Sequence, residues 1–179
     1  MNEKFNVMLD LETLGTTPGS VILSIGAVSF DENGLGNEFY CTIDAQSAIS
    51  SGLTVSGDTF KWWMGQKAEA RKALFERTVS IHKALDNFAD WLEAEGDPKQ
   101  IRVWGNGSDF DNTILAKAYE VVQGRPTPWA FWNNRCYRTV CSVMNAKQRK
   151  QEGVPHNALD DAKSQANHLV QLFKARAVW

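Results

Sequence analysis

Residues 7–14, VMLDLETL, alternate near the start of the chain. Val7, Leu9 and Leu11 are apolar, and Met8, Asp10 and Glu12 stand between them. This period of two predicts a β-strand with two distinct faces. On such a strand Asp10 and Glu12 project from the same face, with their Cα atoms roughly 6.5–7 Å apart. Burying two carboxylates is unfavourable unless a cation compensates them, and hard divalent ions such as Mg²⁺ or Mn²⁺ prefer oxygen ligands. The alternative is an edge strand with a solvated acidic face.

The composition is that of an ordinary soluble globular protein, with 43% hydrophobic and 22% charged residues. The length of 179 residues fits a single domain over residues 1–179. The N-terminus lacks the pattern of a signal peptide, and no apolar stretch approaches the roughly 18 residues that span a bilayer. Cys41, Cys136 and Cys141 form no CxxC pair. We therefore expect a cytoplasmic protein that does not bind membranes.

The net charge of −2 argues against a surface coated in positive charge for gripping duplex nucleic acid. A local basic run is nevertheless present between residues 135 and 150, where no acidic residue occurs. Its members are Arg135, Arg138, Lys147, Arg149 and Lys150. The run can serve phosphate contact, although a solvated helix end is the commoner reason for such a pattern.

Hydrophobic periodicity and turn residues predict alternating strands and helices along the chain. The strands are expected at residues 7–14, 21–30, 38–43, 101–106 and 128–133. Helices are expected at residues 59–75 (one or two short ones), 80–95, 110–122, 139–150 and 157–174, with a loop at 45–58. Because hairpins come first and helices later, the order indicates an α/β fold with a mixed rather than all-parallel sheet.

Further carboxylates lie where strands and helices meet. Asp109 and Asp111 follow the fourth predicted strand, at the kind of strand end where α/β folds gather ligands. His156 precedes a predicted helix whose first turn carries Asp160 and Asp161. Each of these aspartates could equally be a helix cap or a first-turn residue facing the helix dipole. Amphipathicity does not choose between Asp160 and Asp161, which lie on opposite sides of the apolar stripe.

Two adjacent tryptophans, Trp62 and Trp63, lie among basic residues in the predicted helical segment 59–75. Aromatic faces mixed with cations are typical of surfaces that bind single-stranded nucleic acid. Core packing is the usual role of tryptophan. Because neighbours on a helix point about 100° apart, we expect at most one of the two to be fully buried, and the other to line a groove.

Three motifs in order give the chain a strong family resemblance. They are Asp10-x-Glu12, Asn106-x-x-x-Phe110-Asp111 and His156-x-x-x-x-Asp161. Together they resemble the motifs of the DEDDh 3′–5′ exonucleases, a DnaQ-like group in the ribonuclease H-like superfamily. The opening LDLETLGTTPGSVILSIGAVSF (residues 9–30) and the tryptophan pair resemble the branch that contains ribonuclease AS and related phage exonucleases.

The resemblance implies a ribonuclease H-like α/β fold, with a mixed five-stranded sheet flanked by helices. It also implies that four carboxylates hold two Mg²⁺ or Mn²⁺ ions, namely Asp10, Glu12, Asp111 and Asp161. His156 would be the general base that takes a proton from the attacking water. Substrate contacts would come from Thr13, Leu14, Trp62, Asn106 and Phe110. The implied reaction releases nucleoside 5′-monophosphates from the 3′ end of single-stranded DNA or RNA, or from 3′ overhangs.

Other functions remain open at the level of sequence. A non-catalytic nucleic-acid-binding module on the same fold would be expected to lack some of the carboxylates, and all are present. An endonuclease resembling ribonuclease H itself fits the His156-to-Asp161 spacing less well. Several relatives of this kind are homodimers, so we also expect a homodimer. The choice between DNA and RNA does not follow from the sequence.

Overall fold

The computed structural model describes residues 5–147 and 149–176, and within these ranges five strands form one mixed sheet. The strands are β1 (Asn6–Thr13), β2 (Ile22–Asp31), β3 (Gly34–Thr42), β4 (Arg102–Gly105) and β5 (Asn134–Cys136). Their order across the sheet is β3-β2-β1-β4-β5. β1, β2 and β3 pair antiparallel as two successive hairpins, whereas β4 and β5 join parallel to the β1 side. The mixed α/β fold expected from the sequence is confirmed.

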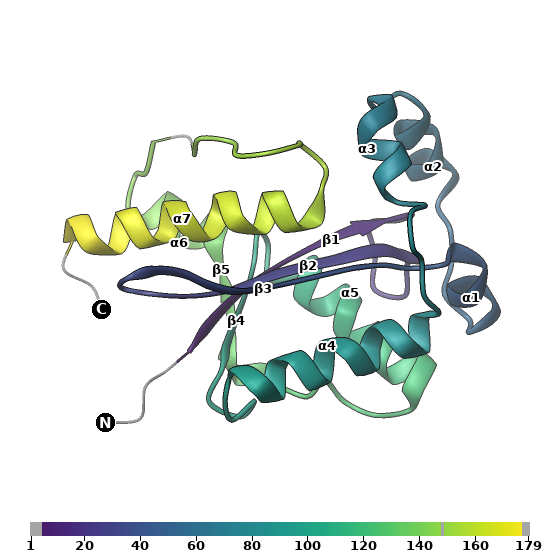
Figure 1. Ribbon diagram of the computed structural model, residues 1–179, viewed down its shortest axis with the longest axis horizontal. Coiled ribbons are helices and arrows are strands. Elements are labelled where there is room, and N and C mark those ends of the chain that lie inside the picture. The colour runs from purple at the N-terminus through teal and green to yellow at the C-terminus, as the bar shows by residue number, and fades with distance from the viewer. Residues whose placement is uncertain (1–4, 148, 177–179) are drawn as a thin grey trace.

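Helices cover both faces of this sheet (Figure 1). They are α1 (Ala45–Ser50), α2 (Gly57–Met64), α3 (Ala68–Ala73), α4 (Ile81–Glu95), α5 (Asp111–Ala118), α6 (Tyr137–Val143) and α7 (Ala158–Arg176). In Figure 1, α6 and α7 lie above the sheet and α4 and α5 below it. The short helices α2 and α3 stand beyond one end of the central strands (Figure 1).

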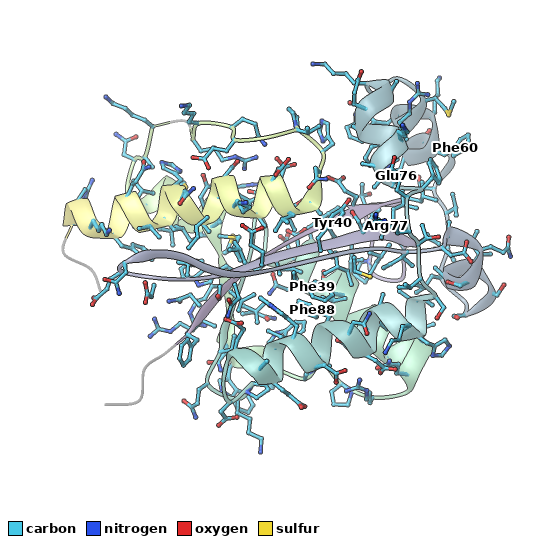
Figure 2. All side chains as sticks on the ribbon, in the orientation of Figure 1. Phe39, Tyr40, Phe60, Glu76, Arg77 and Phe88 are labelled. Carbon is cyan, nitrogen blue, oxygen red and sulfur yellow. The ribbon has the colours of Figure 1, made fainter. Side chains whose placement is uncertain are left out.

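The period of two along β1 separates two cores. Val7, Leu9 and Leu11 are buried on the α4 and α5 side, in the larger cluster of apolar side chains. Met8 points to the other face, where it packs with α6 and α7. On the α4 side, Phe39 and Phe88 meet edge to face with ring centroids 5.3 Å apart (Figure 2). Asp10 and Glu12 therefore share the α7 face with Met8, as alternation predicts.

Helix α4 follows the sequence prediction closely, since Ser80 caps its N-terminus by accepting a hydrogen bond from Lys83 N and Gly96 ends it. Three other predictions differ from the structure. The loop expected at 45–58 contains α1, which Asp44 caps through the backbone N–H groups of Gln46 and Ser47. A helix of six residues is too short for hydrophobic periodicity to reveal.

The strand expected at 128–133 lies further along the chain. Residues Phe131–Asn133 form a 3₁₀ turn, and the strand is β5, which pairs with β4 over three residues. So short a parallel pairing leaves no alternation to detect. The helix expected at 139–150 begins earlier, at Tyr137, and stops at Val143, because Asn145 adopts a positive φ of 46° that ends helical geometry.

None of the helices in the described ranges is long and apolar enough to cross a membrane. The thiols of Cys41, Cys136 and Cys141 are free, in keeping with a sequence that showed no disulfide framework.

Candidate active site

A cleft of about 610 Å³ opens at the carboxyl end of β1, between α2, α7 and the start of α5. Its lining includes Asp10, Glu12, Thr13, Trp62, Asn106, Phe110, His156 and Asp161, which the sequence had singled out. Leu14, also expected to contact substrate, is instead partly buried against the apolar core. Asp111 is only 2% exposed and lies behind the cleft surface. The motifs at opposite ends of the chain thus converge on one place.

Asp111 bridges two strands where they separate. β1 and β4 pair only as far as Met8 and Trp104. Beyond that point the backbone N–H of Leu11 donates to Asp111 Oδ1 at 3.2 Å, and that of Asn106 donates to Oδ2 at 3.1 Å. The carboxylate is therefore held firmly at the start of α5. Asp109 is exposed and takes no part in this arrangement.

The two aspartates at the start of α7 have different roles. Asp160 turns away from the cleft and accepts a 2.8 Å hydrogen bond from the backbone N–H of Val154. Asp161 lines the cleft, where its Oδ1 accepts from Gln151 Nε2 at 2.6 Å and its Oδ2 from the His156 backbone N–H at 3.1 Å. Asp160 anchors the preceding segment, and Asp161 faces the other carboxylates.

His156 sits on the segment that leads into α7, with a positive φ of 63°. This backbone conformation turns its ring toward the cleft, where it meets Trp62 edge to face at a centroid distance of 5.0 Å. Glu12, His156 and Asp161 each offer one ligand atom within 4.8 Å of the others. A base, two carboxylates and an aromatic ring therefore share one corner of the cleft.

The tryptophan pair divides as expected. Trp63 is 5% exposed, and its Nε1 donates a 2.9 Å hydrogen bond to the Thr13 carbonyl. Trp62 is 45% exposed and lines the cleft. Trp63 thus ties α2 to the end of β1, while Trp62 presents its ring to the cleft.

The carboxylates are electrostatically unfavourable as they stand. Burial raises the pKa of Asp10 well above its usual value, and the nearby carboxylates raise it further, Asp111 most of all. Burial, together with the charges of Asp161 and Asp111, raises the pKa of Glu12 to about 8. Burial likewise raises the pKa of Asp111 to about 7, although its backbone hydrogen bonds favour the charged form. Within the described residues, Gln165 gives Asp10 some compensation by donating a 2.8 Å hydrogen bond.

Sequence reasoning missed several residues of the cleft. Gln165 lies four residues after Asp161 on α7, and the helical repeat could have placed it on the same face. Its Oε1 is buried without a hydrogen-bond partner among the described residues. Arg149 was noted only as part of the basic run. The polar residues Thr16, Ser56, Asp58 and Thr59 also line the cleft, and nothing in their local sequence marks them.

Solved nuclease structures share the fold of this chain. The nuclease domain of 3′hExo, a DEDDh family member bound to rAMP, has a TM-score of 0.65 and 13% identity, covering 98% of this chain and 94% of that one. Exonuclease X in complex with 5′ overhanging duplex DNA has a TM-score of 0.60 and 13% identity, covering 97% of this chain and 93% of that one. At such identities the likeness concerns the fold.

Sequence comparison identifies the family. The family model described as a 3′–5′ exoribonuclease Rv2179c-like domain matches residues 5–173, and the chain belongs to this family. An exodeoxyribonuclease of Enterobacteria phage T4 is 27% identical over 163 residues, covering 75% of this chain and 70% of the phage protein. The chain is therefore a 3′–5′ exonuclease, and the resemblance seen in its motifs is confirmed.

Proposed function

We propose that this exonuclease is metal-dependent and removes nucleoside 5′-monophosphates from the 3′ end of single-stranded DNA or RNA, or from 3′ overhangs. One observation carries the proposal. Buried carboxylates from β1 and α5 and a partly buried one from α7 gather around one cleft, and burial raises the pKa values of Asp10, Glu12 and Asp111. Burying ionised carboxylates together is unfavourable without a compensating charge, and bound divalent cations supply that charge.

The donor set fits two Mg²⁺ or Mn²⁺ ions, which the carboxylates of Asp10, Glu12, Asp111 and Asp161 would hold. These are hard oxygen ligands, and carboxylate oxygens of Glu12 and Asp161 lie within 4.8 Å of each other, close enough to share a cation. When bound, two such ions stabilise the attacking and the leaving oxygen of an in-line phosphoryl displacement.

His156 is the proposed general base. Its imidazole stands beside Glu12 and Asp161, and an imidazole nitrogen can accept a proton from water. The backbone N–H of His156 is bonded to Asp161, so the base and a proposed metal ligand are positioned together. The ring would take the proton from the water that attacks the phosphorus atom.

The shape of the cleft supports a single-stranded end as substrate. The exposed ring of Trp62 can stack on an unpaired base, and Phe110 offers a second aromatic surface. Thr13 and Asn106 add polar groups near the carboxylates. The family description names an exoribonuclease and the phage relative is an exodeoxyribonuclease, so both RNA and DNA are tested as substrates.

The test is a gel assay on 5′-labelled single-stranded DNA and RNA of the same sequence, with Mg²⁺, with Mn²⁺ and with EDTA. We expect a ladder that shortens from the 3′ end and disappears in EDTA. Asp161→Asn should be inactive, whereas Asp160→Asn should retain substantial activity if it folds, because Asp160 faces away from the cleft. Intact substrate under every metal condition, with binding still visible by mobility shift, would instead support a non-catalytic module.

Two further expectations belong to this proposal. We expect residues 1–179 to act as one catalytic domain, and we expect a homodimer. Sedimentation velocity at micromolar concentration tests the dimer, since a monomer there would contradict it.

A further inference from the structure

We propose that Arg149 binds the phosphate group of the 3′-terminal nucleotide, the group that becomes the 5′-phosphate of the released product. This inference rests on the proposed function and adds the residue that recognises the substrate's charge. It concerns the basic run of residues 135–150, whose members the structure separates clearly.

Among the described residues that line the cleft, Arg149 is the one lysine or arginine. Arg135 is directed to backbone carbonyls of its own segment, at Trp132 and Asn134. Arg138, Lys147 and Lys150 are exposed. Of the basic run, only Arg149 is therefore placed to contact phosphate in the cleft. The neighbouring lysines are solvated, which is the commoner reason for such a run.

The hydrogen bonds that Asp161 accepts come from groups other than Arg149. Arg149 Nη2 lies 3.6 Å from Asp161 Oδ1, which is too long for a hydrogen bond. That oxygen already accepts from Gln151 Nε2 at 2.6 Å, and the other carboxylate oxygen is bonded to the His156 backbone. The guanidinium therefore forms an ion pair with the carboxylate but donates no direct hydrogen bond to it.

Two further neighbours of Arg149, Tyr137 and His168, bring no negative charge to it. They are joined by a 2.6 Å hydrogen bond between the phenol oxygen and Nδ1. Burial, followed by the charge of Arg149, lowers the pKa of His168 and so favours its neutral form. Burial raises the pKa of Tyr137, which is also neutral. Apart from its ion pair with Asp161, the positive charge of Arg149 is available to an anion in the cleft.

The chemistry of guanidinium suits a phosphate. Its planar arrangement of five N–H donors matches two phosphate oxygens, and it keeps its charge at every relevant pH. The Arg149 side chain is 23% exposed and its Nη2 donates at 3.2 Å to Gln151 Oε1, so it is partly ordered before substrate arrives. A cleft with four carboxylates repels nucleic acid, and Arg149 offsets part of that repulsion at the reacting phosphate.

The experiment compares the wild type with Arg149→Gln, Arg149→Lys and the matched control Lys150→Gln, which removes one positive charge from the adjacent exposed position. Steady-state kinetics on a labelled oligonucleotide should show a KM at least about 10-fold higher for Arg149→Gln. The KM of Arg149→Lys should fall between those of Arg149→Gln and the wild type, because lysine keeps the charge but lacks the planar pair of N–H donors. Lys150→Gln should resemble the wild type.

Product inhibition separates phosphate binding from other effects. Adenosine 5′-monophosphate and adenosine are compared as inhibitors, with the deoxy pair used instead if DNA is the better substrate. Arg149→Gln should weaken inhibition by the monophosphate while leaving the nucleoside unchanged. Mn²⁺ affinity, measured by calorimetry without nucleotide, should be no weaker than in the wild type, because a neighbouring cation has been removed.

The inference would be overturned if the ratio of the inhibition constants of the monophosphate and the nucleoside were the same in Arg149→Gln as in the wild type. So would weaker Mn²⁺ binding with an unchanged ratio, since Arg149 would then act through Asp161. A wild type without nuclease activity would overturn the proposed function instead. In that case calorimetry on the Mn²⁺-loaded wild type and Arg149→Gln still decides whether Arg149 binds the phosphate. The monophosphate should bind more weakly to the variant, and the nucleoside should bind equally to both.

Discussion

Gly26 of β2 lies directly against the backbone of Ala158, the first residue of α7, so that a Cβ atom at position 26 would overlap the Ala158 carbonyl group. Gly26 is also the partner of Asp10 in the β1–β2 pairing. One hydrogen atom in place of a side chain thus lets α7 descend onto the sheet beside Asp10. Asp161, in the first turn of α7, is positioned by this contact.

Gly26→Ala should consequently damage both stability and activity. Overpacking at this contact should lower the free energy of unfolding by about 1–3 kcal/mol, measured by denaturant titration. Exonuclease turnover should fall further than the lost stability explains, because Asp161 moves away from β1. Gly57→Ala is the control, since a Cβ atom there meets no other group within 4 Å. Equal turnover in Gly26→Ala and wild type would refute this role of the contact.

The metal-free protein should lose stability as the pH rises. The pKa values of Glu12 and Asp111 are raised from 4.5 and 3.8 to about 8 and 7. Between those limits the folded state binds more protons than the unfolded state, so the free energy of unfolding falls with pH. We expect the melting temperature in EDTA to decline from about pH 5 to about pH 8 on this account.

Mn²⁺ should remove much of that decline, because a cation compensates the ionised carboxylates and binds only the folded site. Glu12→Gln should flatten the profile in EDTA, since its amide does not ionise. Thermal unfolding followed by circular dichroism measures all three conditions. A melting temperature in EDTA that stays level or climbs across this range would be inconsistent with the buried carboxylate cluster.

Asp111→Asn should abolish turnover and leave the fold intact. The asparagine oxygen can still accept one of the two backbone hydrogen bonds that Asp111 accepts, and the apolar core around β1 and α5 is untouched, so the fold should survive the loss of the other bond. Loss of the charge that the proposed metal site requires should lower kcat by at least about 1,000-fold. Asp109→Asn, at the exposed neighbour, should be close to wild type. Near-normal activity in Asp111→Asn would show that the wrong aspartate was chosen.

The two adjacent tryptophans should behave differently when replaced. Trp62→Ala removes an exposed ring from the cleft and should raise the KM for oligonucleotides about 10-fold with little effect on stability. Trp63→Ala empties a buried position and loses the bond to Thr13, so it should lower the free energy of unfolding by about 3–5 kcal/mol. If both variants lost only stability, Trp62 would have no place in substrate binding.

Local chemistry in the sequence was enough for much of this picture. Alternation along β1 placed Asp10 and Glu12 on one face, because side chains in a strand point alternately to its two sides. Ser80 and Gly96 marked the ends of α4, because capping depends on a few neighbouring residues. The helical angle between Trp62 and Trp63 anticipated that one is buried and the other exposed. Motif order and spacing, through their resemblance to known exonucleases, indicated the family.

Tertiary structure decided what depends on residues far apart in the chain. Helical phase left Asp160 and Asp161 equivalent, and only the segment before α7 distinguishes them, by bonding Asp160 to Val154 and leaving Asp161 facing the cleft. The sequence could not tell which of the five basic residues lies at the active site. The path of the folded chain brings Arg149 to the cleft. The overlap of Gly26 with Ala158 and the bond from Gln165 to Asp10 join elements more than 130 residues apart. No periodicity within one element can encode such contacts, because they arise only when the sheet and α7 pack together.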